Sequence, residues 1–182
     1  MRSRDKSAEN GCEKAREPNF RAIKPLDIAI CALGGALLFS LQAAMSFLPN
    51  IEPVSLLIVL FTIRFRSRTV FMIYIFALLE GLLYGFGLWW FSYLYIWTIL
   101  YVAAHFLRDI KQPIVWAVVL ALFGLLFGAL TSPATFITMG TQAGFAYIIS
   151  GFPFDLIHCA SNFVLTLLLF KPLDKLLQKL LS

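Results

Sequence analysis

TVFMIYIFALLEGLLYGFGLWWFSYLYIWTILY, residues 69–101, contains a single charged side chain, that of Glu80. A helix rises about 1.5 Å per residue and the hydrocarbon core of a membrane is about 30 Å thick, so about 20 residues span it once. This stretch with its flanks is too long for one span, and the glycines and aromatic residues at 85–92 favour a turn at the membrane interface. The sequence therefore predicts two membrane-spanning helices, at residues 69–84 and 89–107.

The composition places the rest of the chain in the same class. Of the 182 residues, 60% are hydrophobic and 14% are charged, and the mean hydropathy is +0.82. A soluble domain of this size could not bury so much apolar surface. Four further apolar runs are present, at residues 26–48, 53–65, 113–130 and 151–170. We therefore predict an all-α integral membrane protein with six transmembrane helices in one bundle.

The basic residues sort to one side of such a bundle. Seven Lys and Arg residues precede the first run, three follow the second, two follow the fourth and three follow the sixth, which accounts for all fifteen. Lys and Arg stay on the cytoplasmic side of short loops, so we expect both termini to be cytoplasmic. Residues 1–24 are expected to form a disordered cytoplasmic tail, 25–171 the membrane domain and 172–182 an amphipathic cytoplasmic tail.

The sequence does not support several kinds of chemistry. The net charge of +5 follows from this topology and does not require a nucleic-acid partner. The chain has neither a G-x-x-x-x-G-K-[ST] phosphate loop nor an H-E-x-x-H motif. Its two histidines, His105 and His158, fall near opposite faces of the predicted bundle, which disfavours a metal site. We therefore expect no enzyme activity, no catalytic residue, no metal and no cofactor.

Three acidic residues lie on the side without cations. Glu52 begins the second span, Glu80 lies in the third, and Asp155 lies in the first turns of the sixth. A charge at the centre of a spanning helix costs about 2.5–3.5 kcal/mol on insertion scales, so such residues are usually functional or paired. Because no Lys or Arg is expected on this side, the three acids must be protonated, solvated, hydrogen-bonded or in contact with a ligand.

Polar residues recur in the sixth span with helical spacing. Asp155, His158, Asn162 and Thr166 are 3, 4 and 4 residues apart, so they share one face of a helix. Such a polar stripe should face the interior of the bundle rather than lipid. Two interpretations stay open: the stripe binds a ligand, or it joins helices through hydrogen bonds.

Aromatic residues form a second stripe, in the fourth span: Trp90, Tyr93, Trp97 and Tyr101. These rings could stack on a flat heteroaromatic ligand, or they could pack in the core, face lipid or belong to an interfacial belt. The candidate binding residues are those of the acidic, polar and aromatic groups that lie towards the outer side: Glu52, Glu80, Tyr84, Trp90, Tyr93, Trp97, Asp155, His158 and Asn162.

The first span carries a ladder of small residues. Ala32, Ala36, Ser40 and Ala44 recur every four residues. Small residues at this spacing let another helix approach closely. The ladder predicts either packing inside the bundle or a docking face for another membrane subunit, for which Ala32, Ala36 and Ser40 are the candidate contacts.

With these features the chain resembles a known family, the substrate-binding S components of energy-coupling factor (ECF) vitamin transporters. The resemblance covers about residues 26–177 and includes the size, the six spans and the cytoplasmic termini. Its local signatures are LPNIEP at 48–53, GFPFDLIH at 151–158 with Asn162-Phe163, and LLLFKP at 167–172.

The resemblance implies a subunit of the bacterial cell membrane that captures a micronutrient from outside. It further implies delivery by toppling of the subunit, together with a membrane coupling subunit and two ATPase subunits. An A-x-x-x-A face on the first helix would contact the coupling subunit, and Ala32 and Ala36 match it. The outer acids and the absence of outer cations favour a neutral or cationic ring compound, a vitamin or vitamin precursor.

Two other functions stay open from the residues. The chain could be a stand-alone proton-coupled transporter of small molecules that uses Glu80 and Asp155, or an intramembrane enzyme with His158 and Asp155 as acid and base. The sequence also leaves open whether residues 134–150, between the last two spans, form a lid.

Overall fold

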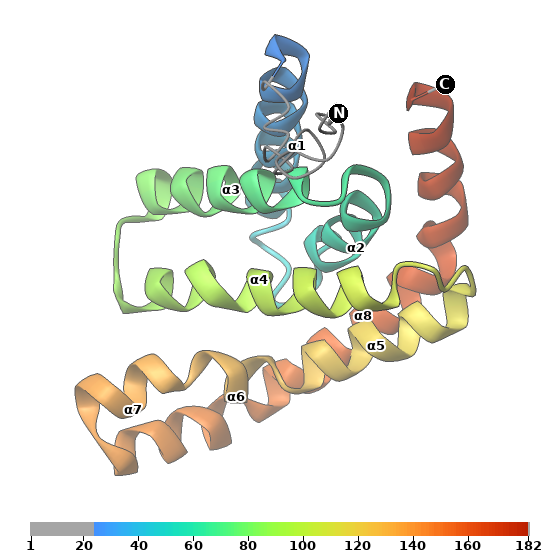
Figure 1. Ribbon diagram of the computed structural model, residues 1–182. Helices are drawn as coiled ribbons and strands as arrows, with labels where there is room; N and C mark the ends of the chain where they lie inside the picture. Colours follow the sequence, from blue (N-terminus) through green and yellow to red (C-terminus); the bar gives the residue numbers. More distant parts are fainter. Residues whose placement is uncertain (1–23, 182) are drawn as a thin grey trace, which may run out of the picture.

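The computed structural model describes residues 24–181, and this part of the chain is helical and has no strands. The predicted tail at residues 1–24 lies outside the described residues, apart from Lys24. Within the described range, eight helices follow one another (Figure 1): α1 (Pro25–Ala44), α2 (Val54–Phe65), α3 (Arg68–Tyr84), α4 (Leu88–Leu107), α5 (Pro113–Leu125), α6 (Phe127–Thr131), α7 (Pro133–Met139) and α8 (Thr141–Leu181).

Three of these helices, α1, α4 and α8, are long and apolar enough to cross a membrane. The helices α2 and α5 are shorter and also apolar. Large apolar side chains are exposed on α1, α3, α4, α5 and α8, among them Leu33, Phe71, Val102, Leu122 and Leu168. In water this exposure would be costly, whereas lipid accepts it. The structure therefore indicates an all-α membrane protein.

Glycines set the contact between α1 and α3. Gly34 and Gly35 are buried, and a Cβ atom at either position would lie 2.6 Å from the side chain of Met72 or Ile75 on α3. The absence of side chains lets the two helices approach closely, as is common between membrane helices. At the N-terminal ends of the same two helices, Asp27 Oδ1 and Arg68 Nη2 form an ion pair at 2.8 Å.

The predicted fifth span, 113–130, is broken in the structure. The helix α5 ends at Leu125, Leu126 has φ −93° and ψ 1°, and α6 begins at Phe127. Gly128 lies in the first turn of α6, where backbone N–H groups lack partners within the helix. Its N–H donates instead to both carboxylate oxygens of Asp155 on α8, at 3.1 and 3.2 Å. The break therefore depends on an acceptor that is remote in sequence.

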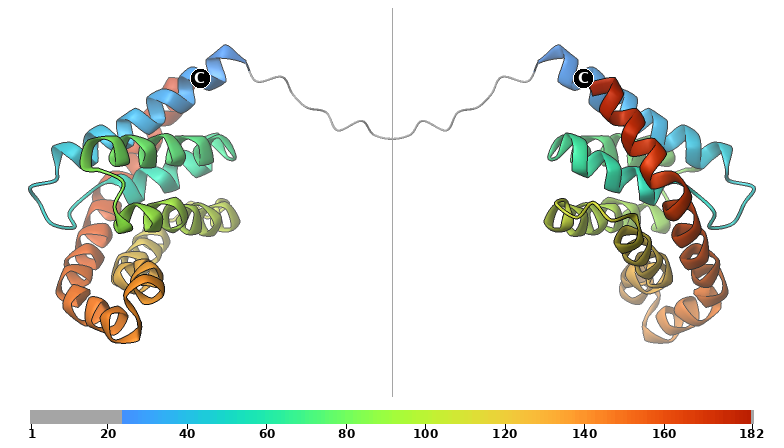
Figure 2. Two further views of the ribbon diagram at one scale, coloured as in Figure 1. Left: turned by 90° about the vertical axis from the view of Figure 1, so that its left-hand side faces the viewer. Right: turned by 90° about the vertical axis from the view of Figure 1, so that its right-hand side faces the viewer.

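The helix α8 is longer than the predicted sixth span. It begins at Thr141 rather than near residue 151, and it continues to Leu181 through Pro153 and Pro172. Prolines kink helices, and Figure 2 shows α8 changing direction along its length. The segment at 134–150 is a helical hairpin, in which α7 turns at Gly140 (φ 85°) into the first turns of α8.

The predicted amphipathic tail at 172–182 continues α8 as far as Leu181. Its Asp174 accepts a hydrogen bond from Arg64 Nε at 2.8 Å. This ion pair joins the last turns of α8 to the C-terminal end of α2.

A glycine substitution tests the packing of α5 on α8. A Cβ atom at Gly124 would lie 2.8 Å from the backbone carbonyl carbon of His158, and backbone cannot move aside as a flexible side chain can. We expect Gly124→Ala to destabilise the detergent-purified protein by about 1–3 kcal/mol, the usual cost of overpacking. Thermal unfolding would show this as a lower Tm.

Gly151→Ala is the matched control, because nothing lies within 4 Å of a Cβ atom at that position of α8. Alanine is favoured over glycine in helices by about 1 kcal/mol, so its Tm should be unchanged or higher. Equal Tm values for the two variants would contradict the close α5–α8 contact.

Candidate functional site

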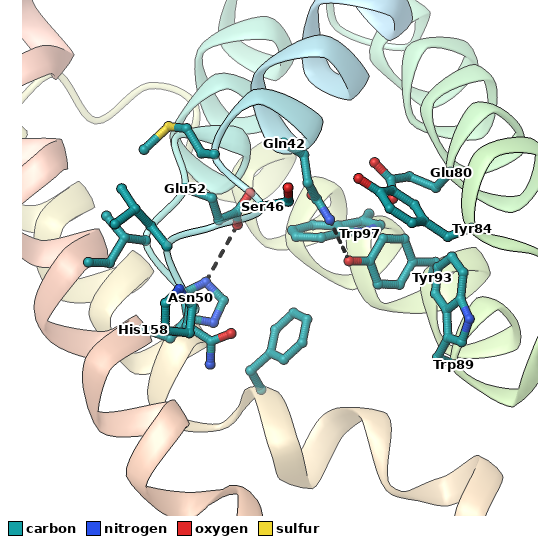
Figure 3. A pocket seen from close by; sticks show the side chains of 15 residues that line it. Gln42, Ser46, Asn50, Glu52, Glu80, Tyr84, Trp89, Tyr93, Trp97 and His158 are labelled. Atoms are coloured by element: carbon teal, nitrogen blue, oxygen red, sulfur yellow. Dashed lines mark hydrogen bonds and ion pairs between the residues drawn. The ribbon is translucent and has the colours of Figure 1, made fainter.

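A cavity of about 360 Å³ opens between the C-terminal end of α1, the loop at 45–53, and the helices α3, α4 and α8 (Figure 3). This volume lies at the lower end of the range for small-molecule pockets, about 300–1,000 Å³. The lining residues come from segments far apart in sequence: Gln42, Met45, Ser46, Leu48, Pro49, Asn50, Ile51, Glu52, Glu80, Tyr84, Trp89, Tyr93, Trp97, Phe127 and His158.

The loop at 45–53 is attached to α8 by Asn50. Its backbone is left-handed (φ 57°), a conformation that asparagine tolerates better than most residues. The Asn50 side chain donates to the carbonyl oxygen of Phe154 at 2.9 Å, and the Asn50 carbonyl accepts from Ser161 Oγ at 2.7 Å. The loop and α8 therefore form one wall of the cavity.

The Glu52 carboxylate lies at the N-terminal end of α2. It accepts from the N–H of Val54 and the hydroxyl of Ser55, both at 3.2 Å. A carboxylate at a helix N-terminus also interacts favourably with the helix dipole. Glu52 Oε1 lies 3.5 Å from His158 Nε2 on α8, so the two side chains face each other across this wall (Figure 3).

Glu80 lies on the opposite wall, beside Tyr84 (Figure 3). Only 2% of Glu80 is exposed. Its Oε1 atom has no hydrogen-bond partner among the described residues, and no Lys or Arg belongs to the cavity lining. The cavity lining thus contains two carboxylates and no Lys or Arg.

Aromatic rings from α4 form the wall next to Glu80. Trp89, Tyr93 and Trp97 are four residues apart, and successive rings pack edge to face with centroids 5.1 and 5.5 Å apart. Tyr93 accepts a hydrogen bond at its hydroxyl from Gln42 Nε2 at 2.7 Å. Trp97 is 1% exposed, and its ring also packs against Phe127. This wall therefore presents the faces and edges of aromatic rings to the cavity near Glu80.

The predicted aromatic stripe and the cavity wall differ by one residue at their outer end. Trp90 does not line the cavity; its Nε1 donates to the carbonyl oxygen of Ala77 on α3 at 2.8 Å, and its ring packs against Phe86. Trp89 lines the cavity in its place. Neighbouring residues point about 100° apart on a helix, so this shift moves the ring to a different face.

The polar stripe of α8 is buried, as predicted, but it divides between two roles. Asp155, His158, Asn162 and Thr166 are all at most 5% exposed. Only His158 lines the cavity. Asp155 binds the N–H of Gly128, and Asn162 Nδ2 donates to the Leu120 carbonyl at 3.1 Å. Asp155 and Asn162 therefore join α8 to α6 and α5 rather than facing the cavity.

Four lining residues carry five buried polar atoms without a hydrogen-bond partner in the described protein: Gln42 Oε1, Glu80 Oε1, Trp97 Nε1 and both ring nitrogens of His158. A buried polar atom left unpaired costs about 1–3 kcal/mol. Such atoms are rare in folded proteins, and here five belong to one cavity. Their arrangement fits a site that is completed by a bound molecule with both hydrogen-bond donors and acceptors.

The structure adds lining residues that the sequence prediction did not include, notably Gln42, Ser46, Trp89 and Phe127. Gln42 and Ser46 had a usable signal, since they are polar and one helical turn apart near the end of an apolar run. Phe127 had none, because only the break at Leu126 and the fold of α8 bring it beside His158, with ring centroids 4.9 Å apart.

The small-residue ladder of α1 lies on the outside of the bundle. Ala32 and Ser40 are exposed and Ala36 is partly exposed, whereas the glycines of α1 are buried against α3. The glycines of α1 thus pack against α3 within the bundle, whereas the alanines lie on an exposed face of α1.

Comparison with protein-family models, characterised proteins and solved structures finds no match to this chain. Within the described residues, no group of three or more His, Cys, Asp or Glu side chains is arranged to hold a metal ion. The functional argument therefore relies on the cavity itself.

Substitutions of the two buried acids Asp155 and Glu80 should differ in their effect on the Tm. Asp155→Leu leaves the Gly128 N–H without an acceptor and should lower the Tm, with a cost of about 1–3 kcal/mol. Glu80→Met removes a carboxylate that lacks a partner at Oε1 and should leave the Tm unchanged or raise it. Thermal unfolding of both variants in detergent checks this, and equal destabilisation would contradict the division between joining and cavity-facing residues.

Proposed function

We propose that this protein is the substrate-capture subunit of an ATP-driven importer of the ECF type, in a bacterial cell membrane. It would bind a vitamin or vitamin precursor from the outer face and deliver it together with a membrane coupling subunit and two ATPase subunits. The observation that carries the proposal is the cavity, whose lining combines two carboxylates, an aromatic wall and five buried polar atoms without a hydrogen-bond partner.

The ion pairs of the fold support the proposed topology of six spans with both termini in the cytoplasm. Arg68 pairs with Asp27 at the start of α1, and Arg64 pairs with Asp174 near the end of α8. These contacts bring together three of the segments to which the positive-inside rule assigns a cytoplasmic position. The cavity acids Glu52 and Glu80 would then lie towards the outer half.

The size and charge of the cavity favour a particular kind of ligand. A volume of about 360 Å³ suits a compound of one or two rings better than a large cofactor. Two lining carboxylates and the absence of Lys and Arg from the lining disfavour an anionic ligand, which would have no cationic partner. A neutral or cationic ring compound fits the lining.

The open face of α1 suits the proposed coupling subunit. Ala32, Ala36 and Ser40 present small side chains outward, so another membrane helix could approach closely there. A binding subunit that does not hydrolyse ATP itself needs such a contact.

A stand-alone proton-coupled transporter is the second candidate, and one observation favours it. Glu80 is a buried carboxyl group without a partner at Oε1, as expected of a group that gains and loses a proton during transport. Uptake by the protein alone in proteoliposomes with a pH gradient would support this alternative.

Cysteine labelling tests the topology. After replacement of Cys12, Cys31 and Cys159, single cysteines would be introduced at Arg66, Lys111 and Gly85. Arg66→Cys and Lys111→Cys should react with a membrane-impermeant maleimide only in permeabilised cells, and Gly85→Cys should react in intact cells. Labelling of residue 66 or 111 from outside would exclude the six-span arrangement.

Helix-face substitutions test the proposed assembly. Ala36→Trp should abolish co-purification of coupling and ATPase subunits from the source cells, because its indole would hold a neighbouring helix away. Phe71→Trp, at an exposed aromatic position of α3 rather than on the α1 ladder, is the control and should retain co-purification. Loss of partners in both variants, or in neither, would argue against this docking face.

A further inference from the structure

The two cavity carboxylates differ in what the protein supplies to them. Glu52 accepts hydrogen bonds from Val54 and Ser55 and lies 3.5 Å from His158. Glu80 is 2% exposed, and among residues 24–181 neither a hydrogen bond to its Oε1 nor a Lys, Arg or His within ion-pair distance is found. One carboxylate is therefore satisfied within the protein and the other is not.

This difference has an energetic consequence. Burial of an isolated carboxylate is costly, and the cost is recovered when a cation and hydrogen bonds satisfy it. A second carboxylate in the same cavity increases the cost, since like charges repel more strongly where water is scarce. A bound cation would remove both penalties at Glu80, whereas a neutral ligand would remove neither in full.

The surroundings of Glu80 suit an organic cation rather than a metal ion. One turn earlier on α3, the ring of Phe76 packs against Tyr93 and Trp97, with centroids 6.0 and 5.8 Å away, so the aromatic wall lies beside the carboxylate. Aromatic faces attract positive charge, especially of nitrogen cations. A metal ion would need several more oxygen or nitrogen ligands, and the described residues offer no such cluster.

We infer that Glu80 is the counter-ion of a bound aromatic cation, a heteroaromatic ring with a permanently charged or protonated nitrogen, held against Tyr93 and Trp97. The unpaired Gln42 Oε1 accepts a donor group of the same ligand, and the unpaired Trp97 Nε1 donates to an acceptor group on it. Glu52 and His158 close the opposite wall. This inference rests on the proposed capture function and narrows its ligand class from neutral or cationic to cationic.

The experiment uses the full chain, purified in detergent, and a small-molecule extract of yeast as the probe. Each protein is incubated with the extract at pH 7 and washed, and the retained compounds are identified by mass spectrometry. The variants are Glu80→Gln, which keeps the shape and removes the charge, and Glu80→Asp, which keeps the charge. Asp109→Asn is the matched control, because Asp109 is exposed in the turn after α4 and lies outside the cavity.

We expect the wild type and Asp109→Asn to retain one aromatic compound that carries a positive charge. Glu80→Gln should retain it at least tenfold less, with an unchanged or higher Tm that shows an intact fold, and Glu80→Asp should recover part of the retention. If Glu80→Gln retained as much of the compound as the wild type, the inference would be overturned, because binding would then not need a negative charge at residue 80.

Two other outcomes separate the inference from the proposed function. Retention of a neutral or anionic compound by the wild type would overturn the cation inference and leave the capture function standing. Retention of no compound by any of the proteins would overturn both.

Discussion

Lipid cannot form hydrogen bonds, so every polar group inside this bundle must find a partner in the protein or in a molecule held by it. Two sets of buried polar residues meet this constraint in different ways. Asp155, Asn162 and Trp90 each bind a backbone group of a neighbouring helix. Glu80, Trp97 and His158 retain unpaired buried atoms and line one cavity. The first set holds the helices together, and the second remains available to a ligand.

Close helix packing gives the cavity its position. Glycines of α1 admit α3, and Gly124 of α5 admits the backbone of α8 at His158. The same contact places His158 next to Phe127, and it directs Asp155 to the N–H of Gly128. A cavity-lining residue, His158, and a residue that joins helices, Asp155, lie three positions apart on α8 and are therefore positioned by the same pair of packed helices.

The loop at 45–53 links this scaffold to the cavity. Asn50 fixes the loop to α8, and Glu52 fixes it to the start of α2. The carboxylate oxygens of Glu52 already accept hydrogen bonds from Val54 and Ser55. Glu52 therefore adds negative charge to the cavity without itself requiring a cation from a ligand. Glu80, on the other wall, lacks this support. This asymmetry between two acids of the same cavity is the basis for proposing a cationic rather than a neutral ligand.

The sequence alone was enough to predict an all-α membrane protein, the six apolar runs and the burial of the polar stripe in α8, because hydropathy and helical period are properties of the local chain. The crossing of the membrane by all six runs stays a prediction. Glu52, Glu80, Tyr84, Tyr93, Trp97 and His158 were also among the candidates and line one cavity.

Tertiary structure decided the rest. The helix break at Leu126 requires the Asp155 acceptor from a distant segment, and the choice of Trp89 over Trp90 depends on how α4 is rotated against α3. The early start of α8 at Thr141 follows from its pairing with α7. Each of these features is set by contacts between residues far apart in the chain, and periodicity within a single helix carries no information about the partner that a side chain will meet.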